Sequence, residues 1–489
     1  MTPLVKLKPV LNGVVDGAAN NHRQGFSTQA IHVGSEPNSE TGAVIPPISL
    51  ATTYKQDSIG VHKVLAYLKA VIWSLTRVQG FEYSRSSNPN RNALERTLAS
   101  LELGGGHALA FASGSSTTAT VLQSLGPNAH VISVNDVYGG TFRYMSRVAK
   151  ENQGLQTTFM DLENLSGDGG EFLDEIRHNT KVKCSAISRF RILIPFGWQL
   201  IWIETPTNPT LRLISIPSIR AHISKLDNPP LILVDNTFLS PYYSSPLLLG
   251  ADVVLHSLTK YINGHSDVVM GALILPDTPF HTELVNKLRF LQNAIGAVPS
   301  AYDSWLAQRG AKTLALRMKA HGTNALALAR ALKDSPLVED IIYPGLASHP
   351  RHHIAWESLS PHAKKWIEGL PERLSSTADF PYSGMISFRI KGGLEAANTF
   401  LTSTRLFALA ESLGGVESLA EHPAKMTHGS IPPAEREKLG ISDGLIRLSV
   451  GVEDEEDLVQ DVLQALEKAA GHLAWLFECT VALVWYPAF

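Results

Sequence analysis

The sequence predicts an α/β fold in which a large, doubly wound and mainly parallel sheet is followed by a smaller α+β domain. Three observations support this prediction. Short apolar runs alternate with segments of helical spacing through the middle of the chain, which is typical of buried parallel strands. Several of these runs end in a polar or charged residue. From about Ser304 the pattern changes to longer helical segments with two later strand candidates.

Five apolar runs are the expected strands of the large sheet, and two more belong to the smaller domain. A helix is expected over Ala325–Ser335, which separates the two groups. Because ligands of doubly wound sheets gather at the carboxyl ends of the strands, candidate functional residues are expected there. The runs are HALAFAS (107–113), HVISV (130–134), LIWIE (200–204), PLILVD (230–235), ADVVLHS (251–257), GMISFRI (384–390) and GLIRLSV (444–450).

Composition narrows the class of protein. The 489 residues are enough for two or three domains, and a net charge of −3 gives no indication of a nucleic-acid or membrane-surface partner. The two cysteines, Cys184 and Cys479, exclude a disulfide scaffold and a Cys-rich metal site. The first residues lack the apolar stretch of a signal peptide. We therefore expect a cytoplasmic protein.

The stretch Phe111–Thr117 (FASGSST) follows an expected strand and opens an expected helix. A glycine followed by small hydroxyl residues at a helix N-terminus can cradle a phosphate with backbone N–H groups and the helix dipole. The alternative is an ordinary strand-to-helix turn.

Two further strand ends carry charged residues. Asp235 ends a strongly apolar strand, where a carboxylate is costly without a cationic partner; the alternative is a helix cap or turn residue. Lys260 follows another strand, and a lysine in a partly dry pocket can act as a Schiff-base nucleophile. Ser257 and Thr259 could hold a phosphate beside it. The nearby His256 and His265 are interpreted as structural, and no metal site is expected.

A phosphate cradle, an acid and a lysine at neighbouring strand ends are together what pyridoxal phosphate requires. The acid pairs with the pyridine nitrogen, the lysine forms the covalent link, and the cofactor acts as an electron sink. The sequence therefore predicts a pyridoxal-phosphate enzyme.

Eight motifs from Gly25 to about residue 470 resemble, in order, those of the Cys/Met-metabolism pyridoxal-phosphate enzymes. Within that family the chain is most similar to the eukaryotic, fungal-like enzymes that cleave cystathionine by γ-elimination. The motifs are YSRSSNPNRNALE (83–95), AFASGSSTT (110–118), DVYGGTFRY (136–144), ETPTNPTL (204–211), VDNTFLSPYY (234–243), SLTKYINGHSDVVMG (257–271), LAESLGGVESLAEHPAKMTH (409–428) and LIRLSVGVEDEEDL (445–458).

The resemblance implies the fold of the aspartate-aminotransferase-like pyridoxal-phosphate enzymes, called fold type I, and a role for each matching residue. Lys260 would bind the cofactor covalently and move protons, and Asp235 would pair with its pyridine nitrogen. The remaining roles follow the same motifs. Tyr138 would stack on the ring and take part in catalysis; Gly114, Ser115, Ser257 and Thr259 would bind the phosphate; Tyr83 and Arg85 would reach the phosphate of a neighbouring subunit; and Arg447, Asn208, Ser412 and Glu411 would bind the substrate.

The implied assembly is a homotetramer, built as a dimer of dimers with active sites shared between subunits. The implied reaction is α,γ-elimination of L-cystathionine to L-cysteine, 2-oxobutanoate and ammonia, with release of hydrogen sulfide from cysteine as a side activity. Glu411 favours γ-chemistry over β-elimination. It leaves open γ-replacement of the cystathionine γ-synthase or O-acetylhomoserine sulfhydrylase type.

The expected organisation has four parts. Residues 1–82 form an N-terminal arm that reaches the neighbouring subunit, 83–303 the cofactor-binding domain, 304–471 the C-terminal domain, and 472–489 a tail. Three segments have no counterpart in the family: 64–79, 182–199 and 472–489. Removing the two internal ones joins stretches of continuous family sequence.

Both internal segments begin with valine and end with glutamine. Valine codons begin with GT and one glutamine codon ends with AG, which are the two ends of an intron. The hypothesis is that both are retained introns and that the 489-residue chain is an inactive product. The alternatives are an amphipathic helix at the first segment, with Val64, Leu68, Val71, Ile72 and Leu75 at helical spacing, and a membrane anchor at the tail.

If the segments are translated, the first displaces the lead-in to Tyr83 and Arg85, and catalytic geometry tolerates little misplacement. The retained-intron hypothesis predicts that the 489-residue protein binds pyridoxal phosphate poorly or is insoluble, whereas a chain lacking all three segments is yellow and active. Cofactor absorbance and activity of the two purified proteins provide the measurement. Equal values in both, or both internal segments in the mature transcript, would contradict the hypothesis.

Overall fold

The computed structural model describes residues 24–38, 41–62, 80–165, 169–179, 199–371, 374–429 and 431–485. The internal segment 64–79 lies wholly outside the described residues. Of the segment 182–199, only Gln199 is described, and it is the first residue of strand β6. Its side chain is buried and donates through Nε2 to the carbonyl oxygen of Ile176 at 3.1 Å.

The larger domain is built on a seven-stranded sheet in the order β3-β9-β8-β7-β6-β4-β5. Only β9 runs antiparallel to its neighbours, so the other six strands share one direction and the predicted mainly parallel sheet is confirmed. The strands are β3 His107–Phe111, β4 His130–Val134, β5 Gln156–Met160, β6 Gln199–Glu204, β7 Leu231–Asp235, β8 Val253–Ser257 and β9 Gly271–Leu275.

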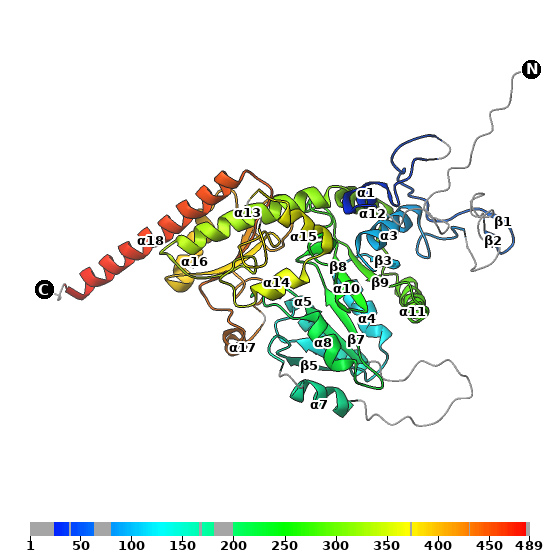
Figure 1. Ribbon diagram of the computed structural model, residues 1–489, viewed down its shortest axis with the longest axis horizontal. Coiled ribbons are helices and arrows are strands. Elements are labelled where there is room, and N and C mark those ends of the chain that lie inside the picture. Colours follow the sequence, from blue (N-terminus) through cyan, green and yellow to red (C-terminus); the bar gives the residue numbers. More distant parts are fainter. Residues whose placement is uncertain are drawn as a thin grey trace, which may run out of the picture.

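Helices cover this sheet on both sides (Figure 1). Helix α3 packs against β3 and α12, whereas α4 packs against β9 and α11. The helices of this part of the chain are α1 Phe26–His32, α3 Pro89–Leu101, α4 Gly114–Ser124, α5 Gly139–Arg143, the π-helix η1 Tyr144–Ala149, α6 Lys150–Gln153, α7 Gly170–Asn179, α8 Ile216–Ile223, α9 Ser240–Tyr243, α10 Pro246–Leu249, α11 Pro279–Ile295 and α12 Ala301–Ala311. A short hairpin of β1 Gln56–Ser58 and β2 Val61–His62 lies in the N-terminal arm.

The smaller domain has a five-stranded, mostly antiparallel sheet in the order β10-β11-β14-β13-β12. Its strands are β10 Val338–Ile342, β11 Met385–Ile390, β12 Ala408–Leu409, β13 Leu419–Glu421 and β14 Leu445–Ser449. Its helices are α13 Leu314–Asp334, α14 His352–Ser358, α15 Pro361–Glu368, α16 Gly393–Ser403, α17 Pro433–Lys438 and α18 Glu455–Trp485. The predicted domain boundary at residue 304 falls inside α12.

Helix α18 continues beyond the domain to which its first turns belong. Its first half packs against α13 and α16, whereas its last turns project from the body of the molecule (Figure 1). The backbone of the tail is therefore helical as far as Trp485. Among the described residues, no helix combines the length and apolar character needed to cross a lipid bilayer.

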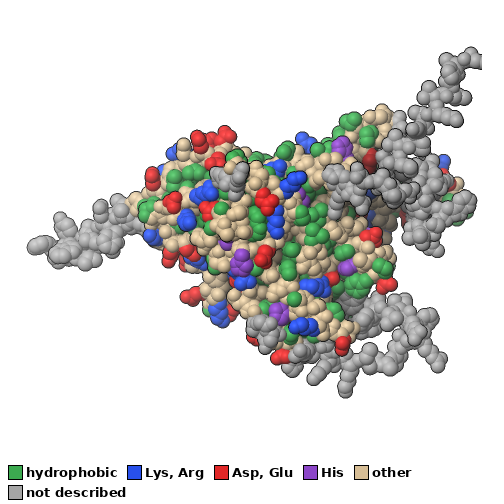
Figure 2. All heavy atoms as spheres, viewed as in Figure 1, with side chains coloured by type: hydrophobic (Ala, Val, Ile, Leu, Met, Phe, Trp, Pro, Cys, Tyr) green, Lys and Arg blue, Asp and Glu red, His purple; other side chains and the backbone are tan. Residues whose placement is uncertain are grey.

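Charged side chains of both signs are scattered over the visible face of the molecule (Figure 2). This distribution agrees with the small net charge of −3.

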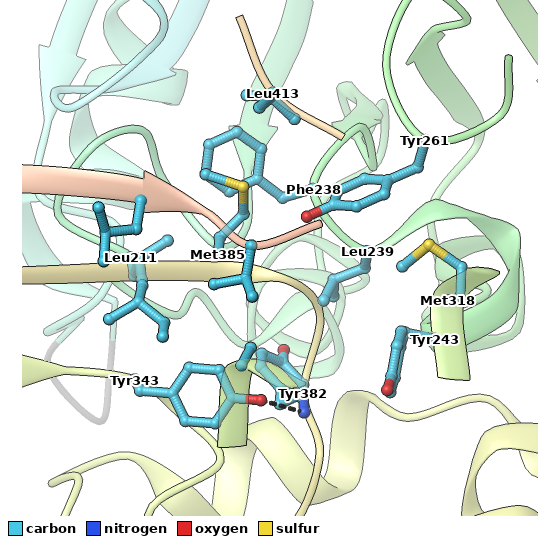
Figure 3. Close-up of a cluster of buried hydrophobic side chains, with 14 of the residues drawn as sticks. Leu211, Phe238, Leu239, Tyr243, Tyr261, Met318, Tyr343, Tyr382, Met385 and Leu413 are labelled. Atoms are coloured by element: carbon cyan, nitrogen blue, oxygen red, sulfur yellow. Dashed lines mark hydrogen bonds between the residues drawn. The ribbon is translucent and has the colours of Figure 1, made fainter. Parts of the chain in front are cut away.

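One hydrophobic core extends across both domains. Phe238, from the larger domain, lies near Met385 and Leu413 of the smaller one (Figure 3). In the same cluster, the hydroxyl oxygen of Tyr343 accepts a hydrogen bond from the backbone N–H of Tyr382 at 2.7 Å. The shared core fixes the two domains relative to each other.

The Tyr343 hydroxyl is completely buried and accepts an N–H that is also buried. Tyr343→Phe leaves this donor unsatisfied, so we predict a loss of about 1–3 kcal/mol in the free energy of unfolding. Denaturant unfolding of both proteins measures it. The control Tyr302→Phe changes an exposed hydroxyl and should stay within about 0.5 kcal/mol of the parent. Equal effects of the two substitutions would contradict the prediction.

Candidate active site

A cavity of about 570 Å³ opens at the carboxyl ends of the central strands. Its wall includes the last residues of β6, β7 and β8, which are Glu204, Asp235 and Ser257. The smaller domain contributes Arg447 and the segment that contains Ser412. The cavity therefore lies between the domains, at the sheet edge where the sequence predicts a ligand.

The segment predicted to cradle a phosphate forms the N-terminus of α4. Ser113 caps the helix by accepting from the Ser116 N–H, so the first turn is fixed and its N-terminus faces the cavity. Gly114 lies so close to Ser257 that a Cβ atom on it would be 3.5 Å from the Ser257 hydroxyl oxygen. Ser115 and Thr259 also line this end of the cavity. The structure thus brings together all four residues expected to bind a phosphate.

Asp235 lies in the cavity wall, and its Oδ1 atom accepts from the N–H and the hydroxyl of Thr237 at 3.0 and 2.6 Å. Thr237 is itself held in place, because its hydroxyl oxygen accepts from the Ser257 N–H at 2.9 Å. Burial raises the pKa of Asp235, and the Thr237 hydrogen bonds counteract part of that rise. A cationic partner in the cavity would favour the ionised carboxylate.

Lys260 points its amine toward the smaller domain, where Nζ donates to the Ser412 hydroxyl oxygen at 2.7 Å. Burial, followed by the positive charge of Arg447, lowers the pKa of Lys260 to about 8. Glu421 and Glu411 act in the opposite direction. A substantial fraction of this amine is therefore neutral near physiological pH and can act as a nucleophile or a base.

Arg447 is 2% exposed and is held by three groups. Its Nη1 atom donates to Asn208 Oδ1 at 2.8 Å and lies 2.9 Å from Glu421 Oε1, while Nη2 donates to the Ser412 carbonyl oxygen at 2.7 Å. The predicted cluster of Arg447, Asn208 and Ser412 is thus assembled. Glu421 was not predicted, although a buried arginine on a strand requires an acidic partner and this was the available signal.

Tyr138 and Glu411 both line the cavity. Tyr138 stands at the N-terminus of α5 with its ring half-exposed toward the cavity, and its N–H donates to Glu204 Oε2 at 2.9 Å. Glu204 was not among the predicted site residues, although it ends an apolar run as Asp235 does. Arg143 also lines the cavity and was not singled out.

Tyr83 and Arg85 do not line the cavity of their own chain. Tyr83 is half-exposed and forms a β-bridge with Thr53. Arg85 donates to the carbonyl oxygen and Oδ1 of Asn293, on α11, at 2.9 and 3.0 Å. Their expected role in a neighbouring subunit stays a prediction.

The two histidines interpreted as structural lie in hydrogen-bonded positions. His256 Nε2 lies 3.3 Å from Glu102 Oε2 in a fully buried pair, and His265 Nδ1 lies 2.7 Å from the Asn263 carbonyl oxygen. Among the described residues, no three His, Cys, Asp or Glu side chains gather as metal ligands.

The residues present fit pyridoxal phosphate. A glycine at a helix N-terminus beside the Ser257 hydroxyl suits a phosphate, a buried carboxylate suits a protonated pyridine ring, and an amine of lowered pKa suits covalent attachment. Fold and site together define a pyridoxal-phosphate enzyme of fold type I.

Comparison with known proteins gives the family. The chain belongs to the Cys/Met metabolism PLP-dependent enzymes, whose family profile matches residues 27–364 and 373–467. It is 46% identical over 447 residues to a cystathionine gamma-lyase of Bos taurus, covering 91% of this chain and 94% of the relative. It is 46% identical over 448 residues to that of Saccharomyces cerevisiae, covering 91% and 98%.

Solved structures agree with this assignment. The crystal structure of cystathionine gamma-lyase from yeast aligns with a TM-score of 0.74 and 43% identity, covering 92% of this chain and 100% of that one. A cystathionine gamma synthase from Xanthomonas oryzae, in complex with aminoacrylate and cysteine, aligns with a TM-score of 0.76 and 35% identity, covering 92% and 99%.

The lowered pKa of Lys260 predicts a pH-dependent stability. Between about pH 8 and its ordinary value of 10.5, Lys260 is neutral in the folded protein but protonated in the unfolded chain. The unfolded state then binds more protons, so this group makes the protein more stable as pH rises through that range. Below pH 8 the folded protein instead bears the cost of a buried charged amine.

Lys260→Met removes this titration. We predict that its stability relative to the parent decreases as pH rises from about 7 to about 10, measured by urea midpoints of the cofactor-free proteins. The control Lys365→Met changes an exposed lysine and should show a constant difference. A constant difference for Lys260→Met would contradict the lowered pKa.

Proposed function

We propose that the protein catalyses α,γ-elimination of L-cystathionine, which yields L-cysteine, 2-oxobutanoate and ammonia, as part of transsulfuration and cysteine biosynthesis. The observation that carries the proposal is the position of Lys260. Its amine donates a hydrogen bond to the Ser412 hydroxyl, and the Ser412 carbonyl oxygen accepts one from Arg447. A base thus lies beside a carboxylate-binding arginine. Relatives named cystathionine gamma-lyase, which match over almost their whole length, support the choice of substrate.

Arg447 is suited to bind the α-carboxylate of an amino-acid substrate. Its guanidinium presents a planar array of donors that matches a carboxylate, and Asn208 and Ser412 fix its orientation. Lys260 and Arg447 both donate hydrogen bonds to Ser412, so a substrate held by Arg447 would have its Cα near the amine of Lys260. Holding the reacting atoms in this way removes much of the entropic part of the barrier.

Lys260 moves the protons. Its pKa of about 8 lets it take a proton from Cα when neutral and return one when charged. Pyridoxal phosphate, bound by Lys260, Asp235 and the α4 cradle, supplies an electron sink for the electron pair left at Cα. Tyr138 is expected to stack on its ring, since its half-exposed aromatic face borders the cavity.

Glu411 places a carboxylate in the cavity wall on the side of the smaller domain. An acidic group in this position suits γ-chemistry on a substrate with a distal ammonium group. Hydrogen sulfide release from cysteine is an expected side activity of the same site.

We further propose that the protein works in the cytoplasm as a homotetramer, a dimer of dimers with shared sites. The support for shared sites is that Tyr83 and Arg85 lie outside their own cavity and are exposed enough to meet another subunit. The N-terminal arm also exposes Val44, Leu50 and Ile59, apolar side chains that a second copy would cover.

The main alternative is γ-replacement, as in cystathionine γ-synthase or O-acetylhomoserine sulfhydrylase. It is supported by the similarity to solved structures titled cystathionine gamma synthase, with TM-scores of 0.76 and 0.75. The other alternative is the inactive product of retained introns described above, which rests on the sequences of segments 64–79 and 182–199.

Product analysis separates these alternatives. We predict that the purified protein releases 2-oxobutanoate and cysteine from L-cystathionine without a sulfur acceptor, and that Lys260→Ala reduces this rate at least about a thousandfold, because the base and the covalent attachment are lost together. Lys365→Ala, on the surface of α15, is the matched control. Turnover only with an activated homoserine plus cysteine would instead establish the synthase. No turnover with either substrate pair, together with poor binding of pyridoxal phosphate, would support the inactive product.

A further inference from the structure

Two buried carboxylates that the proposed reaction does not use lie at the ends of adjacent parallel strands. Glu204 is the last residue of β6, and Asp136 is the second residue after β4. Because β4 and β6 pair in parallel, the segments that follow them leave the sheet at the same edge. The two side chains are 5% and 1% exposed. Carboxylates are buried at such a cost only when other groups satisfy them.

Glu204 joins the two segments with its two oxygen atoms. Oε2 accepts the N–H of Tyr138, which follows β4, and Oε1 accepts the N–H of Asn208, which follows β6; both distances are 2.9 Å. The side chain of Asn208 in turn accepts from Arg447. A single carboxylate therefore connects the tyrosine on one side of the cavity with the arginine cluster on the other.

Asp136 makes the reciprocal connection. It belongs to the segment after β4, and its Oδ2 atom accepts from the hydroxyls of Thr207, at 2.7 Å, and of Thr210, both in the segment after β6. Both threonines are buried. Each segment thus sends a carboxyl group to donors on the other.

We propose that Glu204 and Asp136 form a reciprocal clamp of positioning residues, which fixes Tyr138 relative to Asn208 and Arg447 and so aligns the cofactor ring with the substrate carboxylate. The clamp acts through backbone N–H groups and threonine hydroxyls. The inference uses the proposed function for its kinetic readout only; the visible circular dichroism of the bound cofactor tests it independently of substrate.

Glu204→Gln preserves the shape of the side chain but leaves one oxygen for two N–H donors, and its amide group faces the other donor. In the pyridoxal-phosphate-loaded protein we expect kcat to fall about tenfold or more and KM for L-cystathionine to rise, since small misplacements cost up to about a hundredfold. The visible circular dichroism per bound cofactor changes as well. A purely structural role would lower the melting temperature and leave these three quantities unchanged.

Asp136→Asn and the double variant complete a double-mutant cycle. If the two carboxylates act as one clamp, the loss in kcat/KM of the double variant is close to that of the more severe single variant rather than to the product of both. The control Asp461→Asn changes another buried carboxylate that accepts backbone N–H groups, those of Arg405 and Leu406, and that does not line the cavity; it should leave kinetics and circular dichroism unchanged.

The milder variant Thr210→Val removes one clamp donor and leaves both carboxylates in place, so it decides the question if Glu204→Gln yields no folded protein. A changed circular dichroism with reduced kcat supports the clamp. Parental kinetics and circular dichroism in the folded variants, or multiplicative losses in the cycle, would overturn it. If even the parent does not cleave cystathionine, the proposed function fails while the circular dichroism of the variants still tests the clamp.

Discussion

The buried positive charge of Arg447 is the constraint on which the arrangement of the cavity depends. A guanidinium that is 2% exposed costs several kcal/mol unless it is paired and fully hydrogen-bonded. Glu421, Asn208 and Ser412 satisfy Nη1 and Nη2 from three separate segments, two in the smaller domain and one in the larger. The Nε atom has no hydrogen-bond partner among the described residues. Ser412 has a φ of +111°, a strained conformation for a residue with a side chain, and it bonds to Arg447 and Lys260 at once.

The opposite wall of the cavity contains buried carboxyl groups, which also need partners of opposite charge. Glu204 and Asp235 are direct neighbours on β6 and β7, and burial raises the pKa of both, for Glu204 with a further contribution from Asp235. Two adjacent carboxylates that are shielded from water favour the binding of a cation beside them in the cavity. A protonated pyridine ring meets that need, which is why the cavity suits pyridoxal phosphate better than a neutral ligand.

The chemistry requires groups from both domains, so the domains must be held in one relative position. The common core does this, because Phe238 packs near Met385 and Leu413 across the boundary. The boundary at residue 304 lies inside α12. It divides the sequence into two parts, but the hydrophobic packing continues across it. The loops that carry Tyr138 and Asn208 are connected to each other by the hydrogen bonds of Glu204 and Asp136.

The sequence by itself determined the fold class and the strands around the cavity, and it predicted Gly114, Asp235 and Lys260 as cofactor residues, because strand ends and turns are encoded by neighbours in the chain. Only the tertiary structure decided which buried charges meet. Glu204 and Tyr138 are far apart in sequence, as are Glu421 and Arg447, and nothing in their local patterns specifies the pairing. The antiparallel direction of β9 is also a property of the tertiary structure, because an apolar run of five residues does not reveal its direction in a sheet.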